Sequence, residues 1–151
     1  MNVLKSGLIL LVVSLLAFHG NAAPIDACLS KARKMTLAID QKQNTEYCFQ
    51  AYAKELSKTK CFERVSNLKK TDLQENLNSI CFYQAQEFTD LKSCVAGANR
   101  FKLADNHDEA LFECYMQFQS QTSQKQCFEI SRQLTLPHRK NHMRQHCQIN
   151  Y

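Results

Sequence analysis

The spacing of the eight cysteines constrains this chain more than any other feature of its sequence. They stand at positions 28, 48, 61, 81, 94, 114, 127 and 147, so a longer and a shorter interval alternate without exception, and a unit with two cysteines occurs four times. An even number of cysteines in so regular a pattern indicates a disulfide framework. We place the four copies at residues 28–60, 61–93, 94–126 and 127–151.

The first 23 residues have the organisation of a secretory signal. Lys5 gives a charged start, residues 8–18 form an apolar core, and small residues lead up to Pro24. The apolar core is too short to span a bilayer comfortably, since a membrane helix needs roughly 20 apolar residues. An uncleaved membrane anchor is the alternative. We expect residues 1–23 to be removed on export, which leaves residues 24–151 as one domain without a transmembrane segment.

The residues around the first cysteine of each copy follow helical periodicity. Large apolar residues recur one and seven positions after it, and small or apolar residues stand four positions after it. This spacing forms one face of a helix rather than of a strand. Ser57, Asp90 and Ser123 stand four residues before that cysteine in the later copies, where their side chains can cap a first turn. Each copy is therefore predicted to begin with a helix of about twelve residues.

A second predicted helix has the second cysteine of each copy near its middle. Aromatic residues follow this cysteine directly in three copies, and most residues four positions on either side are apolar. Asp72 and Asp105 are expected to cap the helix, and Pro137 marks its start in the last copy, since proline disfavours helical geometry in the residue before it. The chain is therefore predicted to be all-α, with four tandem helical hairpins in a short solenoid or a compact helical array.

Helix geometry selects the disulfide pairing. The turn within each hairpin is predicted about ten residues from both of its cysteines, so the two sulfur atoms lie at the same height above the turn. The competing pattern pairs the second cysteine of each copy with the first cysteine of the next, has unequal arms around its turn, and leaves Cys28 and Cys147 over. The predicted bridges are Cys28–Cys48, Cys61–Cys81, Cys94–Cys114 and Cys127–Cys147.

Three histidines form the sharpest local pattern. His138, His142 and His146 recur at intervals of four residues and so lie on one helix face. Two histidines at this spacing can chelate a divalent metal ion, but three along one straight helix cannot all reach one tetrahedral ion. Arg139 and Arg144 beside them repel a cation. We expect no metal or other cofactor, and interpret the row as a solvated basic face.

Charge is unevenly distributed among the copies. The first copy carries a net charge of +4 and the last +3, whereas the two middle copies carry −1 each. Either the basic ends bind an acidic partner, a phospholipid surface or a glycan, or they are the solvated faces that terminal repeats need. The mature chain carries only +4 in total, which is modest beside nucleic-acid-binding proteins, so no nucleic acid is expected as a partner.

No residue pattern in the sequence indicates a reaction. The cysteines are assigned to bridges, and there is no Gly-rich phosphate loop or nucleophile elbow. The dense acidic run Asp105, Asp108, Glu109 and Glu113 fits the start of a helix, where negative charge is favoured.

The leading hypothesis for function is a secreted, non-enzymatic binding module. It would be extracellular, or periplasmic in a bacterium, and monomeric, and would bind an unidentified extracellular protein or surface as an effector or toxin-like protein does. The alternative is a carrier of an apolar ligand or lipid held between helix layers. An enzyme with an unrecognised site is the third hypothesis.

Overall fold

The structure is a computed structural model that describes residues 23–68 and 71–150. The predicted signal segment, residues 1–23, lies outside the described residues except for Ala23. Within those residues the chain forms eight α-helices, two short 3-10 helices and no strand. The elements are α1 (Pro24–Arg33), α2 (Ala38–Tyr52), η1 (Ala53–Glu55), α3 (Lys58–Ser66), α4 (Thr71–Gln84), α5 (Leu91–Ala98), α6 (Ala104–Gln117), η2 (Gln119–Gln121), α7 (Gln124–Gln133) and α8 (Pro137–Ile149).

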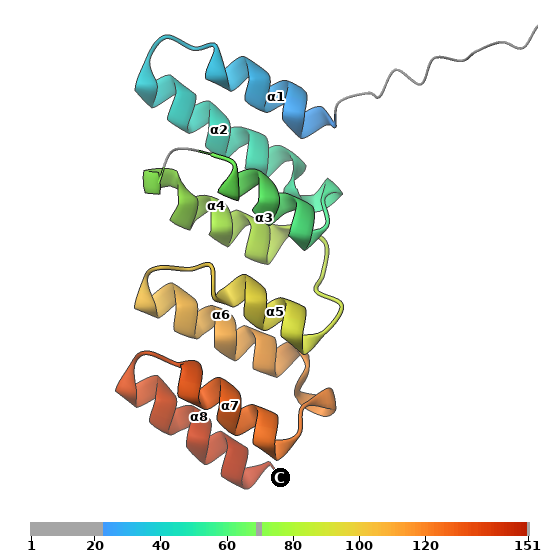
Figure 1. The fold of residues 1–151 in the computed structure, drawn as a ribbon, viewed down its shortest axis with the longest axis vertical. Coiled ribbons are helices and arrows are strands. Elements are labelled where there is room, and N and C mark those ends of the chain that lie inside the picture. Colours follow the sequence, from blue (N-terminus) through green and yellow to red (C-terminus); the bar gives the residue numbers. More distant parts are fainter. Residues whose placement is uncertain (1–22, 69–70, 151) are drawn as a thin grey trace, which may run out of the picture.

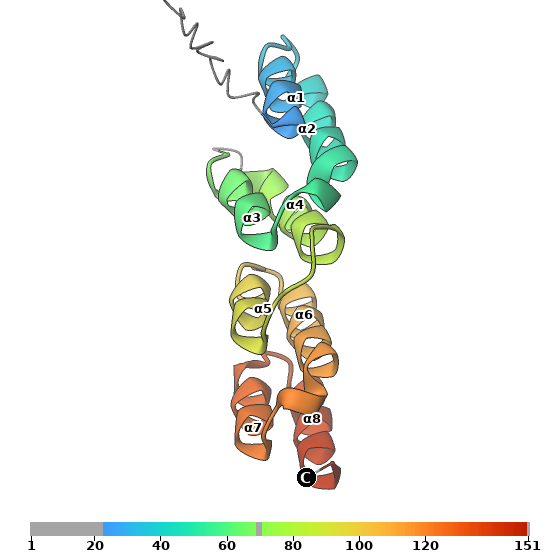
Figure 2. The ribbon, with the colours of Figure 1, turned by 90° about the vertical axis from the view of Figure 1, so that its right-hand side faces the viewer.

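The helices form four hairpins stacked in chain order along one axis (Figure 1). Each odd-numbered helix packs against the even-numbered helix that follows it. Seen from the side, α3, α5 and α7 form one column, and α4, α6 and α8 form a second (Figure 2). The all-α prediction is confirmed, and of the two arrangements that the sequence left open the chain adopts the short solenoid.

The predicted bridges are present, and each one joins the two helices of a hairpin. They link Cys28 to Cys48, Cys61 to Cys81, Cys94 to Cys114 and Cys127 to Cys147, with Cα–Cα distances of 5.5 to 5.7 Å. These distances lie in the normal range for a disulfide, so the hairpin geometry accepts each bridge without rearrangement. The competing pairing, between the cysteines of consecutive hairpins, is excluded.

Capping residues define where the first helix of each later hairpin begins. The side chains of Ser57, Asp90 and Ser123 accept hydrogen bonds from backbone N–H groups in the first turns of α3, α5 and α7, as predicted. These helices are shorter than expected, with 8 to 10 residues, because the chain turns before reaching the last predicted apolar position.

The prediction that Asp72 and Asp105 cap the second helices is wrong. The N-cap of α6 is Leu103, whose backbone is extended and whose side chain makes no capping bond, and Asp105 lies inside the first turn. Asp72 likewise lies in the first turn of α4. Both carboxylates still lie near the positive end of a helix dipole, which explains the acidic preference at these positions.

One apolar core runs through the whole stack and includes seven of the eight bridged cysteines. The predicted inner faces supply it, and its largest fully buried side chain is Tyr115. Aromatic rings connect the core of the second hairpin with that of the third. The ring centroid of Phe82 on α4 lies 5.1 Å from that of Phe88, which precedes α5, and 5.6 Å from that of Phe101, which follows α5. The hairpins therefore bury one another's faces, as marginal single hairpins must.

Candidate interaction surfaces

A buried carboxylate joins the third hairpin to the fourth. Asp108 on α6 is 0% exposed, and its two oxygens accept hydrogen bonds from the backbone N–H groups of Thr135 (2.7 Å) and Leu136 (2.8 Å). Burial raises the pKa of Asp108, but these bonds and one from His107 outweigh burial, so the pKa is lowered overall. The ionised carboxylate thus holds the turn that leads into α8.

Glu75 makes the same connection one hairpin earlier. It occupies the repeat position of Asp108 in the preceding copy and accepts hydrogen bonds from the backbone N–H groups of Lys102 (3.0 Å) and Leu103 (3.3 Å). We call this arrangement the carboxylate clamp. In it, the residue 14 positions after the first cysteine of one hairpin holds the two N–H groups just before the even-numbered helix of the next.

The seam between the first and second hairpins is held differently. Lys42 stands at the clamp position and pairs with Asp72 at 3.7 Å. The guanidinium of Arg64 on α3 binds both oxygens of Asp26 on α1, each at 2.9 Å. The hydrogen bond from Arg64 is the main cause that lowers the pKa of Asp26. At this seam a bidentate ion pair therefore connects the two hairpins, as the carboxylates of Glu75 and Asp108 do at the later seams.

An aspartate–histidine pair lies at the clamp of the third hairpin. His107 Nδ1 lies 3.1 Å from an oxygen of Asp108, and its Nε2 lies 3.0 Å from the side-chain oxygen of Asn99. Such a pair can orient a catalytic base, but only if the second ring nitrogen faces a nucleophile. Here that nitrogen is bound to Asn99, so the pair links the end of α5 to α6 instead of facing a substrate.

A hollow of about 410 Å³ opens between the second and third hairpins, on the side of the even-numbered helices. We call it the aromatic hollow, and its lining residues are Lys58, Phe82, Tyr83, Ala85, Glu87, Phe88, Glu113 and Gln117. The Lys58 amine donates a hydrogen bond to the Phe82 carbonyl in the last turn of α4 and lies 4.8 Å from the centre of the Phe88 ring. Because the amine is directed at the helix end, Glu87 and Glu113 supply the exposed charge of the hollow.

The environment of Lys58 leads to a testable titration. Burial lowers the pKa of its amine to about 8, although Glu87 acts in the opposite direction. We expect the NMR signals of its side chain to titrate with a midpoint near pH 8. Between about pH 8 and the ordinary value of 10.5, the unfolded chain holds a proton that the folded chain has lost, so this group makes stability rise with pH. Lys58→Met should remove both the NMR titration near pH 8 and this rise of stability with pH. An NMR midpoint above pH 10 would contradict the lowered pKa of Lys58.

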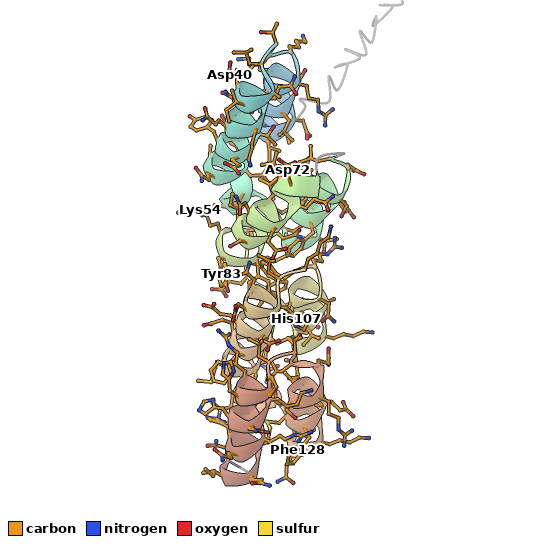
Figure 3. All side chains as sticks on the ribbon, turned by 90° about the vertical axis from the view of Figure 1, so that its left-hand side faces the viewer. Asp40, Lys54, Asp72, Tyr83, His107 and Phe128 are labelled. Atoms are coloured by element: carbon orange, nitrogen blue, oxygen red, sulfur yellow. A yellow bond between two sulfur atoms is a disulfide. The ribbon has the colours of Figure 1, made fainter. Side chains whose placement is uncertain are left out.

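Beside the aromatic hollow lies a row of exposed apolar side chains, one from each of the last three hairpins. Tyr83 on α4, Met116 on α6 and Ile149 on α8 occupy one repeat position in consecutive copies and are 51%, 46% and 81% exposed. We call them the apolar row; Figure 3 shows Tyr83 at the outer edge of the stack. Because these side chains share one repeat position in a stacked array, they lie on the same side of the column formed by α4, α6 and α8.

Charged groups of α6 and α8 flank the apolar row. Burial raises the pKa of the Tyr83 hydroxyl, Glu109 and Glu113 raise it further, and Arg139 lowers it. A second, smaller hollow of about 180 Å³ lies between α6 and α8, where the ring centres of Phe112 and His142 are 6.0 Å apart. The even-numbered helices therefore present an apolar strip bordered by carboxylates on α6 and by basic groups on α8.

The three histidines of α8 have different surroundings. His138 is exposed, His142 packs on Phe112, and His146 Nδ1 lies 3.1 Å from the Tyr115 hydroxyl. Among residues 23–68 and 71–150, no group of three or more His, Cys, Asp or Glu side chains is arranged to hold a metal ion. The rings of His142 and His146 therefore make separate contacts along the α6–α8 seam.

Comparison of the chain with protein-family models, curated proteins and solved structures found no match. In the part of the chain that the structure describes, no helix combines the length and apolar character needed to cross a membrane. The function therefore has to be inferred from the chain's own surfaces.

Proposed function

We propose that the protein is exported and acts as a non-enzymatic binding module for a protein partner, with the face of α4, α6 and α8 as its interaction surface. Four disulfides in a chain of this size are typical of oxidising compartments outside the cytosol. The predicted signal segment, residues 1–23, supports the same destination.

The apolar row beside the aromatic hollow is the observation that carries this proposal. Exposed aromatic and sulfur-containing side chains next to a hollow are the features from which interface hot spots are built. Glu87 and Glu113 line the hollow together with the half-exposed ring of Tyr83, so the hollow suits a cationic side chain that can also stack on an aromatic face. The partner we propose is a protein segment that inserts an arginine or lysine here and lays apolar residues along the row.

Packing of the interior favours a binding module over a carrier. The buried apolar side chains of all four hairpins form a single cluster. The hollows of 410 and 180 Å³ described above open at the surface, along seams between helices. A carrier would shield its ligand between the helix layers, where these core side chains lie.

Charge reversal at the hollow tests this function. We expect Glu113→Lys to lower capture of a partner from native extracellular fluid by roughly tenfold or more, because a cation of the partner would meet a like charge. Tyr83→Ala should have a similar effect through lost apolar contact. The oxidised, exported protein serves as bait, and quantitative mass spectrometry measures capture.

Glu129→Lys on α7 is the matched control, because it makes the same charge change at an exposed site in the other column of helices. Equal capture of the partner by the unmodified protein, Glu113→Lys, Tyr83→Ala and Glu129→Lys would refute the proposed surface. Lipid or another apolar molecule retained by the purified protein would favour the carrier instead.

A further inference from the structure

The outward side of the first hairpin exposes positions that are covered in every later hairpin. Cys28 is partly exposed although its three counterparts are 0% exposed, and Asn44 is partly exposed where the counterparts are Leu77, Ala110 and Met143, each 0% exposed. Tyr47 lies on the same side and is 62% exposed; its counterpart in the second hairpin, Ile80, is 9% exposed, whereas the later counterparts Glu113 and His146 are exposed and partly exposed. We call this side the N-terminal edge. It is the surface that a preceding hairpin would cover.

The N-terminal edge is hollowed. A depression of about 480 Å³ lies between α1 and α2, with Cys28, Lys31, Met35, Asn44, Tyr47 and Tyr52 among its lining residues. In the third and fourth hairpins, the counterparts of Met35 are Phe101 and Leu134, which are 6% and 2% exposed. The depression therefore lies where, in the later hairpins, the equivalent side chains are buried against the preceding hairpin.

Two backbone N–H groups at this edge correspond to the two N–H groups that a carboxylate binds in the carboxylate clamp. Thr36 and Leu37 occupy the same repeat positions as Thr135 and Leu136, whose N–H groups bind Asp108, and they are the same residue types. Within residues 23–68 and 71–150, the N–H groups of Thr36 and Leu37 have no hydrogen-bond acceptor. The first hairpin is thus built to receive a carboxylate that this part of the chain does not supply.

Charge at the edge selects the kind of carboxylate donor. Three basic side chains, Lys31, Arg33 and Lys34, are exposed at the end of α1, just before Thr36 and Leu37 in the sequence. A second copy of the chain is a poor donor, because its residues 127–151 carry a net charge of +3 and have Asn141 at the clamp position. Head-to-tail stacking would bring two basic surfaces together without a carboxylate between them.

We propose that the N-terminal edge binds an acidic helical segment of another protein, which continues the stack and places an aspartate or glutamate on the N–H groups of Thr36 and Leu37. This inference rests on the proposed function of a binding module and adds a second surface with a partner of opposite charge. The apolar side of that helix would fill the depression and pack against Tyr47.

Site-specific photo-cross-linking tests the proposal. The full-length coding sequence is expressed with p-benzoylphenylalanine at position 47 or, in a parallel sample, at position 83, and the exported protein is irradiated in native extracellular fluid. From position 47 we expect a cross-link to an acidic, helical segment of another protein. Replacing the aspartate or glutamate of that segment by its amide should lower the yield by roughly tenfold or more.

Two proline variants give a matched control. Leu37→Pro removes one of the two receiving N–H groups and should lower the yield at position 47 at least tenfold. Ala38→Pro should leave it unchanged, because proline is tolerated in a first helical turn and Pro137 stands at the same repeat position. Leu37→Ala should also leave it unchanged, since the side chain of its counterpart Leu103 stays 59% exposed in the stack. Circular dichroism confirms that each variant is folded.

The other outcomes overturn the inference. They are a cross-link to a second copy, to residues 1–22 of the same chain, or to a basic or uncharged segment, and the absence of any cross-link. A cross-link from position 83 but none from position 47 would reject the N-terminal edge and leave the proposed function standing. Cross-links from neither position would reject both.

Discussion

Reduction of all four disulfides is expected to unfold the chain. Each bridge closes a loop of 20 residues, which stabilises the fold by on the order of 3 kcal/mol in the chain-entropy estimate. Four such contributions amount to about 12 kcal/mol, as much as the entire stability of a typical domain, roughly 5–15 kcal/mol. The far-UV circular dichroism signal of helix should therefore be lost when reductant is added and the thiols are alkylated.

Removing single bridges separates the roles of the hairpins. Cys94→Ala with Cys114→Ala removes the bridge of a hairpin that has neighbours on both sides. We expect it to lower the free energy of unfolding of the whole stack by about 3 kcal/mol. Cys127→Ala with Cys147→Ala should instead fray α7 and α8, seen as faster amide hydrogen exchange there alone. A reduced, alkylated chain that kept its helical signal and a cooperative thermal transition would show that packing alone suffices.

The second large effect is expected from Asp108→Ala, with a loss of about 3 kcal/mol or more in the free energy of unfolding. The variant leaves the N–H groups of Thr135 and Leu136 without acceptors in a partly buried seam, and each unsatisfied group costs roughly 1–3 kcal/mol. Chemical denaturation measures the change. Asp105→Ala on the same helix is the control: its side chain is 78% exposed and its ion pair with Arg139 spans 3.8 Å, so the loss should stay below about 1 kcal/mol.

Acid should destabilise the protein by protonating Asp108, the carboxylate of the same clamp. The pKa of Asp108 is lowered in the folded protein, so its contribution to stability is fully present above the ordinary carboxyl pKa and is lost as pH falls through the folded value. Asp108→Asn cannot ionise and should be less stable at neutral pH, with a flatter dependence below about pH 4. Identical acid profiles for the two proteins would contradict the clamp.

The fold could be predicted because its determinants are local and repeated. The equal distance of both cysteines from each turn fixed the bridges, and single capping residues such as Ser57, Asp90 and Ser123 marked helix starts. Helix lengths were overestimated because apolar residues such as Leu68 and Phe101 belong to the loops after α3 and α5, where they still face the core. Apolar periodicity reports which side of the chain is buried, and it does not report where the helix ends.

The interaction surfaces were harder to foresee, because they depend on partners distant in sequence. Asp108 stood in an acidic run that suited a helix start, yet its partner N–H groups come 27 and 28 residues later. Lys58 lay in a predicted first turn, and its environment arises only when the segment after α4 brings Phe88 against it. Aligning the copies by position would have found part of the pattern, since Glu75 with Asp108, and Tyr83 with Met116, occupy equal repeat positions.

The carboxylate clamp gives the stack a direction, and this bears on how such a chain can lengthen by duplication. A duplicated copy of the third hairpin would bring both an acceptor carboxylate and a receiving turn, so it could be inserted after itself without new chemistry. A copy of the first hairpin would bring Lys42 where its successor needs an acceptor, and a copy of the fourth would bring Asn141. Duplication of the third hairpin would therefore preserve the clamp, whereas duplication of the first or the fourth hairpin would not.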